Sequence, residues 1–126
     1  MDVPEIQSYQ FGCIVIDGKT YTKDVIILPD RVIGGWWRQE GHALHPDDLT
    51  DVVDLSASAA APSGIRPQVL IVGQGAYGQM RVTPETQRAL QAAGIELIAQ
   101  PTEKACQTYN HLREQRTVAA ALHLTC

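Results

Sequence analysis

A glycine-rich segment that follows a short apolar run contains residue types that can hold a small anion. The apolar run covers residues 69–72 and is followed by GQGAYG at 73–78. Glycine amides are not covered by a Cβ, and successive amides can surround an anion. Arg81, in the same predicted loop, adds a charge-assisted partner. We therefore expect Gly73, Gly75 and Arg81 to line a small-anion site; the alternative is that the glycines only permit an irregular turn.

The same letters satisfy the G-x-G-x-x-G pattern of dinucleotide sites, but the context does not fit it. In such a site the last glycine lies within the helix that holds the pyrophosphate. Here the helix start signal, Thr83-Pro84, comes several residues later, and the acidic residue expected about 20 positions on is Glu96, inside a predicted strand. The sequence therefore predicts no dinucleotide cofactor.

Arg38, Glu40 and His42 follow the tryptophan pair and form a second group of polar residues. Arginine holds carboxylates or phosphates, and histidine changes its charge near neutral pH. If the strand expected at 32–38 lies beside the central strand, Arg38 and His42 share one opening with the glycine loop. The alternative is that Arg38 and Glu40 pair at the surface, with each other or with Asp48, which stabilises little.

Two histidine spacings resemble metal-binding pairs, but neither supplies a full set of ligands. They are His42-x-x-His45 and His123-x-x-Cys126. Zinc needs three or four ligands that converge, and residues 123 and 126 of one strand face opposite ways. The G-x-S-x-G motif of nucleophilic serines is absent, and no pair of carboxylates stands out for acid–base work. We therefore expect no metal, no cofactor and no catalytic residue.

Composition and charge indicate one ordinary globular domain, 1–126. The net charge is -4 and the basic residues form no run, which argues against a nucleic-acid partner. No apolar run approaches the roughly 20 residues that span a bilayer, and the polar start predicts no signal peptide. The three widely spaced cysteines favour free thiols in a reducing compartment. We therefore expect a cytoplasmic protein without a membrane partner.

The first half of the chain contains mostly strand signals. Asp17-Gly18 between two β-rich runs predicts a hairpin with strands near 11–16 and 19–22. Further strands are expected at 25–28 and 32–38; in the latter, one tryptophan belongs to the core and the other covers a loop or walls a pocket. Pro46 and the acidic residues after it favour a short helix at 46–54. Residues 56–67 have the composition of a surface connection.

The second half alternates between strands and helices. After the central strand at 69–72, a helix is expected at 84–93, with Thr83 as its N-cap and Gly94 at its end. A strand at 95–99, a helix that opens near Thr102 and a strand at 118–124 follow. Strands that are separated by helices imply crossover connections and a largely parallel arrangement. The predicted fold is therefore α/β, with helices on one mixed sheet.

Motifs along most of the chain resemble one family of small α/β domains. They are FGCIVIDGKTYTKDVIILPDRVIGGWWRQEGHAL, VLIVGQG, TPETQRALQAAGIELI and PTEKACQTYNHLREQRTVAAALHLTC. The family includes the adipogenesis-associated domain proteins and assembly factor 3 of mitochondrial respiratory complex I. The resemblance implies a three-layer fold with a central mixed sheet of five strands, one of them antiparallel, and an extra N-terminal β-hairpin. It implies little about the protein's chemistry. The linker at 56–63 is longer than the segment that usually leads into the central strand in this family.

Three hypotheses for function follow from these patterns. The first is a soluble binding or interaction module with a small-anion cleft, formed by Gly73, Gly75, Arg81, Arg38 and His42. The second is an enzyme for a small carboxylated or phosphorylated metabolite, with His42 as its acid or base. The third, which the resemblance implies, is an assembly factor that needs a continuous apolar surface patch. The partner is thus a small anionic ligand or a protein, and the oligomeric state stays open.

Overall fold

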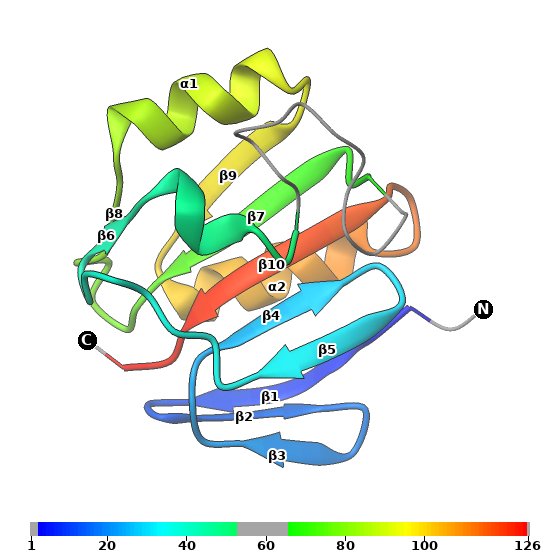
Figure 1. The fold of residues 1–126 in the computed structure, drawn as a ribbon. Coiled ribbons are helices and arrows are strands. Elements are labelled where there is room, and N and C mark those ends of the chain that lie inside the picture. Colours follow the sequence, from blue (N-terminus) through cyan, green and yellow to red (C-terminus); the bar gives the residue numbers. More distant parts are fainter. Residues whose placement is uncertain (1–2, 53–65, 126) are drawn as a thin grey trace.

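A central sheet of five strands organises the computed structural model, which describes residues 3–52 and 66–125 (Figure 1). From one edge to the other, the strands are β5 (Arg31–Gly34), β4 (Val25–Leu28), β10 (Val118–His123), β7 (Val69–Gln74) and β9 (Glu96–Gln100). β10 pairs with β7, and β7 with β9, in parallel; β4 is antiparallel to both β10 and β5. β4 is thus the single strand that runs against the others, as the resemblance implied.

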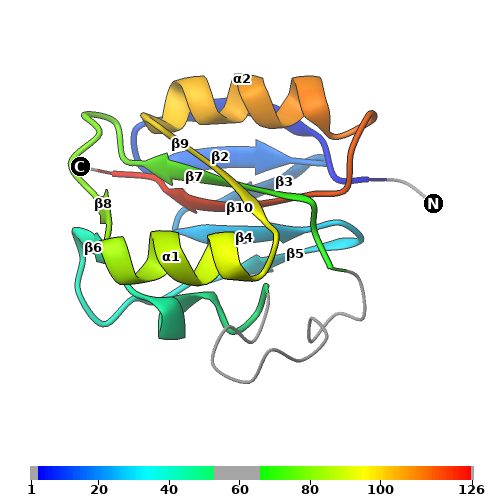
Figure 2. The same cartoon turned by 90° about the horizontal axis from the view of Figure 1, so that it is seen from above.

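The central strands are apolar along nearly their whole length because both faces of the sheet are covered. β4 and β10 are buried at every position, and β7 is buried up to Gly73. Figure 2 shows α2 (Thr102–Leu112) on one face and α1 (Pro84–Ala92) with the 3-10 helix η1 (Pro46–Leu49) on the other. The predicted three-layer α/β fold is confirmed.

The two helices lie on opposite faces because their connections run in opposite directions across the sheet. The chain moves from β7 through α1 outward to β9, then returns through α2 past β7 to β10. Parallel crossovers are almost always right-handed, so a reversal of direction places the next helix on the other face. Each face therefore has its own hydrophobic core.

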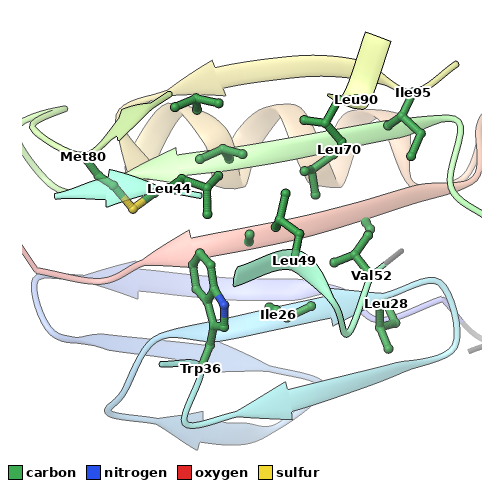
Figure 3. Packing of buried hydrophobic residues seen from close by; sticks show 14 residues of the cluster. Ile26, Leu28, Trp36, Leu44, Leu49, Val52, Leu70, Met80, Leu90 and Ile95 are labelled. Carbon is green, nitrogen blue, oxygen red and sulfur yellow. The ribbon is translucent and has the colours of Figure 1, made fainter. Parts of the chain in front are cut away.

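The core under α1 and η1 is built from alternate residues of the strands. Figure 3 shows Leu70 of β7, Ile26 of β4, Leu49 of η1 and Leu90 of α1 in this cluster. Trp36 also belongs to it, and its Nε1–H donates to the carbonyl oxygen of Asp48 at 2.9 Å. This core therefore holds the loop after β5 and η1 against the sheet.

A separate three-stranded sheet, with β1 (Ile6–Gln10), β2 (Cys13–Ile16) and β3 (Lys19–Tyr21), contributes to the core on the α2 side. The hairpin between β2 and β3 turns at Asp17-Gly18, where both φ angles are positive, at 50° and 81°. The predicted hairpin is confirmed, whereas β1 was not expected from the sequence.

Some element boundaries differ from the prediction for local reasons. β5 ends at Gly34 because Gly35 takes a φ of 71° and turns the chain away from the sheet. The helix expected at 46–54 is a 3-10 helix that ends at Leu49, and its last two predicted residues lie outside the described ranges. Most of the connection expected at 56–67 is also outside them. In residues 3–52 and 66–125, every helix is too short or too polar to cross a membrane.

Candidate functional site

Polar residues follow the buried apolar residues of three neighbouring strands at one edge of the sheet. Ile26, Ala121 and Val72 face the α1 core; Asp24 lies two residues before Ile26, and His123 and Gln74 lie two residues after Ala121 and Val72. Side chains of a strand alternate between faces, so these three polar residues share the face of the apolar rows. His123 pairs directly with Gln74, and Leu122 with Val25. The edge is therefore a polar border of the α1 core.

Asp24, Arg38 and His123 form a compact cluster at this border. Arg38 Nη1 lies 2.8 Å from Asp24 Oδ2, and its Nη2 donates to the carbonyl oxygen of Gly41 at 3.0 Å. His123 Nδ1 lies 2.8 Å from the same Asp24 oxygen and 3.0 Å from Arg38 Nη2. Asp24 Oδ1 accepts the Leu124 N–H at 2.8 Å. One carboxylate thus joins a guanidinium, an imidazole and a main-chain amide.

The pKa of Asp24 lies below its ordinary value because these contacts favour the ionised carboxylate. Burial alone raises this pKa, but the hydrogen bonds from His123, Leu124 and Arg38 outweigh the desolvation. An ionised carboxylate and a guanidinium both contact His123 Nδ1, and the carboxylate only accepts whereas the guanidinium only donates. Nδ1 therefore hydrogen-bonds to one of the two at a time, as donor to Asp24 or as acceptor from Arg38.

Two buried nitrogens of this cluster have no hydrogen-bond partner in the part of the chain that the structure describes. They are Arg38 Nε and His123 Nε2, neither of which has a hydrogen-bond partner among residues 3–52 and 66–125. The side chains are only 5% and 8% exposed. Arg38 also lies over the Trp36 ring, with its Cζ 4.7 Å from the ring centroid. An unpaired buried donor or acceptor costs about 1–3 kcal/mol, so these atoms mark a place suited to a polar group.

A short parallel pair outside the main sheet brings His42 and Arg81 together. β6 (Ala43–Leu44) pairs with β8 (Arg81–Val82), and the Arg81 N–H donates to the His42 carbonyl oxygen at 2.8 Å. The exposed His42 ring lies edge-on to His123, with ring centroids 6.0 Å apart. The structure therefore places Arg38, His42 and Arg81 along one edge, but the condition for a shared opening is not met, because β5 lies at the far side of the sheet, separated from the central strand β7 by β4 and β10.

An open pocket of about 630 Å³ lies at this edge, between the start of α1 and the ends of β7 and β9. Thr83 caps α1, since its hydroxyl accepts the Thr86 N–H at 3.2 Å. The exposed Arg81 is the charged residue of the lining. The lining consists of Gln74, Arg81, Val82, Thr83, Pro84, Gln87, Leu97 and Ala99.

The glycine loop differs from the expected cradle of bare amides. The Gly75 N–H donates to the Thr102 hydroxyl at 2.9 Å, the Ala76 N–H to the Thr125 carbonyl oxygen at 2.9 Å, and the Gly78 N–H to that of Gly75 at 3.2 Å. A Cβ on Gly73 would lie 2.9 Å from both a Leu122 methyl carbon and the Thr102 hydroxyl. Close packing therefore explains why position 73 is a glycine. The amide N–H groups of this loop that were expected to face an anion donate instead to groups of the chain itself.

The surface pairing considered for Arg38 does not occur. Arg38 is buried and binds Asp24, whereas Glu40 pairs with His45 at 2.7 Å. Asp48 instead accepts the His45 N–H at 2.9 Å, close to the start of η1. The described residues contain no group of three side chains that converge as metal ligands. Cys126, in the second metal-like spacing, lies outside those residues.

Aromatic residues divide between core and surface. Trp36 is 7% exposed and Trp37 76% exposed, and both contribute to a shallow pocket beside η1. Phe11 and Tyr77 are also exposed, with ring centroids 6.4 Å apart. This contact joins the turn after β1 to the glycine loop.

Sequence reasoning missed Asp24 altogether and considered His123 only as a metal ligand. Both residues could have been found from the alternation of inward-facing and outward-facing positions along the strands. Each is a single polar residue placed two positions from a buried apolar residue, on the face that the apolar residues define. What the sequence did not show is that β4 and β10 are neighbours, which the register of the sheet establishes.

These features define a class: a small three-layer α/β domain with a mixed five-stranded sheet and an additional N-terminal sheet. The chain belongs to the family described as "Protein of unknown function (DUF498/DUF598)", whose model matches residues 6–123. This match confirms the family to which the sequence motifs pointed.

Solved structures of similar proteins share this fold. The conserved hypothetical protein PH1505 of Pyrococcus horikoshii is 26% identical, with a TM-score of 0.76 over 97% of this chain and 99% of that chain. A Mth938-like domain protein of Bordetella pertussis is 26% identical, with a TM-score of 0.73 over 95% and 85%. The Rpa2829 protein of Rhodopseudomonas palustris is 30% identical, with a TM-score of 0.67 over 94% and 81%. Their descriptions name no activity.

Proposed function

We propose that this domain binds a small organic anion in the pocket at Arg81. The single observation that carries the proposal is the exposed Arg81 side chain beside the N-terminus of α1, in a pocket whose lining includes no acidic residue. Pro84 has no N–H and the Thr86 N–H is capped by Thr83, so the start of α1 contributes mainly the partial positive charge of a helix N-terminus, which favours anions. Arginine adds a fixed charge and planar donors for carboxylate or phosphate.

The rest of the lining supports an anion with a small apolar part. Gln74 and Gln87 are polar, while Val82, Leu97 and Ala99 provide apolar surface. Pockets for small organic ligands combine an apolar lining with a few polar groups, and about 630 Å³ is within their usual range. A phosphorylated or carboxylated small molecule is therefore the class of ligand that we propose.

Of the residues expected to bind the anion, Arg81 is the one that this proposal retains as a direct contact. Arg38 is paired with Asp24, and neither Arg38 nor His42 belongs to the lining of the pocket. Gly73 and Gly75 support the pocket indirectly, because they allow β7 and its loop to pack against Thr102.

Titration calorimetry with inorganic phosphate and phenyl phosphate tests this proposal. Arg81→Ala is expected to weaken binding of both about 10- to 100-fold, since a hydrogen-bonded charged contact contributes about 1.5–3 kcal/mol. Arg88→Ala is the matched control, because Arg88 is exposed on α1 but does not line the pocket. Equal affinities of the two variants, or no binding by the wild-type protein, would contradict the proposal.

A further inference from the structure

Two glutamine side chains in the lining of the pocket hold the main chain on either side of Arg81. The Gln74 Nε2–H, at the end of β7, donates to the Met80 carbonyl oxygen at 3.0 Å. The Gln87 Nε2–H, from α1, donates to the Val82 carbonyl oxygen at 2.9 Å. The two glutamines therefore bracket the residue to which the proposed function assigns the anion.

These contacts fix which end of each glutamine amide is left for a ligand. A main-chain carbonyl oxygen only accepts hydrogen bonds, so the amide nitrogen faces it and the amide oxygen faces away. Neither Oε1 atom accepts a hydrogen bond from another residue in the described part of the chain. Gln87 is exposed, Gln74 is half-buried and both line the pocket. Each glutamine thus offers a ligand an acceptor oxygen that has no donor of its own.

The other polar side chains of the lining do not serve these two oxygens. The Thr83 hydroxyl donates to the Leu44 carbonyl oxygen at 3.1 Å and accepts the Thr86 N–H at 3.2 Å. The donors of Arg81 bind the anionic group in the proposed function. A ligand with acceptor oxygens alone would therefore leave the two amide oxygens unpaired when it displaces water from them. The lining matches an anion that also carries hydrogen-bond donors.

The charge of the lining indicates that these donors are neutral. Arg81 is the charged residue of the lining, and the start of α1 adds a partial positive charge. Both would repel an ammonium group, whereas a hydroxyl group donates to an amide oxygen without carrying a charge. Val82, Leu97 and Ala99 provide apolar surface for the carbon skeleton of such a ligand.

We propose that the ligand is a small anion with hydroxyl groups on its organic part, the class that includes phosphorylated polyols and hydroxy acids. The inference rests on the proposed function, because Arg81 must hold the anionic group. The hydroxyl groups of the ligand donate to Gln74 Oε1 and Gln87 Oε1. The two glutamines thus select among anions by the donors that each anion carries.

Titration calorimetry with glycerol 3-phosphate and propyl phosphate tests this selection. The two esters share the phosphate and the carbon chain, and only glycerol 3-phosphate carries hydroxyl groups. We expect glycerol 3-phosphate to bind about tenfold more tightly, because two hydrogen bonds of ordinary net strength contribute about that factor. Equal affinities would overturn this inference and leave the proposed function standing. A protein that binds neither ester, nor phenyl phosphate, nor inorganic phosphate would overturn both.

Variants test whether the amide oxygens cause the preference. Gln87→Leu should reduce the preference to about threefold, and addition of Gln74→Leu should abolish it. The ratio of the two affinities is the readout, because a variant that only displaces Arg81 weakens the binding of both esters alike. Gln91→Leu is the matched control and should keep the full preference, because Gln91 is exposed on α1 but does not line the pocket. A preference that Gln87→Leu leaves unchanged would overturn the inference, and this single variant decides the matter if the double variant does not fold.

Discussion

At the scale of single residues, Asp24 is the centre of the polar cluster. It accepts hydrogen bonds from Arg38 and the Leu124 amide and contacts His123 Nδ1, so it joins the segment after β5 to the end of β10. Its side chain is 16% exposed, so water replaces these contacts poorly. Removal of its charge would leave Arg38 buried and unpaired, a change that typically costs more than the pair itself contributes.

Asp24→Asn is therefore expected to lower the free energy of unfolding by about 3 kcal/mol at pH 7. The pKa of Asp24 is depressed in the folded protein, so its contribution is present above the unfolded value near 3.9 and is lost as the pH falls through the lower folded value. Urea unfolding of the wild-type protein and the variant should thus differ at pH 7 and approach each other below pH 3. The exposed Asp51→Asn is the control; a difference that stays constant with pH would contradict this account.

At the scale of elements, Thr102 at the start of α2 joins the ends of the two central parallel strands. Its hydroxyl accepts the Gly75 N–H at 2.9 Å, just after β7, and donates to the His123 carbonyl oxygen at 2.6 Å, at the end of β10. The Thr102 N–H also donates to the Gly75 carbonyl oxygen at 3.0 Å. Thr102 is fully buried. The Thr102 hydroxyl therefore connects the ends of β7 and β10 at the edge that carries the polar cluster.

Thr102→Val should destabilise the fold by about 3 kcal/mol, because it keeps the shape but leaves a buried N–H and a buried carbonyl unpaired. Thr102→Ser keeps the hydroxyl and should cost only about 1 kcal/mol for the lost methyl group. Urea unfolding gives both values, and hydrogen exchange at the Gly75 amide should accelerate in the valine variant alone. A serine variant that is as unstable as the valine variant would show that Thr102 stabilises the fold through the packing of its methyl group and not through its hydrogen bonds.

At the scale of the whole molecule, α2 ties the N-terminal segment to the central sheet. Tyr109 is fully buried and its hydroxyl donates to the Pro4 carbonyl oxygen at 2.7 Å. Asn110 both accepts the Ile6 N–H and donates to the Ile6 carbonyl oxygen. Burial raises the pKa of Cys106 to about 12 and raises that of Tyr109 above its ordinary value. Both groups are therefore held in their neutral forms by the fold.

Stability should consequently fall as the solution becomes alkaline. A raised pKa means that the contribution of Cys106 is complete below the unfolded value near 8.5 and is lost as the pH rises toward the folded value. Urea unfolding between pH 8 and 11 should show a decline, to which Cys106 adds up to about 1.4 kcal/mol per pH unit. Cys106→Ala should reduce this slope and Cys13→Ala, at a half-buried position, should not. Equal slopes for the wild-type protein and Cys106→Ala would contradict the prediction.

Most of the fold was predictable because it depends on patterns that are local in sequence. The central strand, the hairpin at Asp17-Gly18 and the capped start of α1 each have a strong local signal, and all three are confirmed. β1, β6 and β8 were missed; β6 and β8 are two residues long and exist only because they pair with each other. Trp36 was expected within a strand but follows the turn at Gly35; that one of the two tryptophans belongs to the core was predicted, and Trp36 is that residue.

The candidate site was predictable only in part, because its residues are distant in the chain. Arg38, His42 and Arg81 were singled out by residue type, and the β6–β8 pair places the latter two together. Asp24 and His123 are 99 positions apart, so no spacing in the sequence relates them. The glycines of the loop correctly predicted a turn. The amide N–H groups of the loop donate to Thr102, Thr125 and Gly75, and these partners cannot be inferred from the local sequence.

The sequence by itself determined the strands of the central sheet, its two long helices, the two buried faces of the sheet and the family, because apolar periodicity and turn residues act over a few positions. Only the tertiary structure decided which polar residues meet. The register of β10 between β4 and β7 places His123 beside Asp24 and Gln74, and a one-residue slip would turn His123 to the opposite face. Strand pairing, which joins residues far apart in the chain, therefore assembles the polar edge.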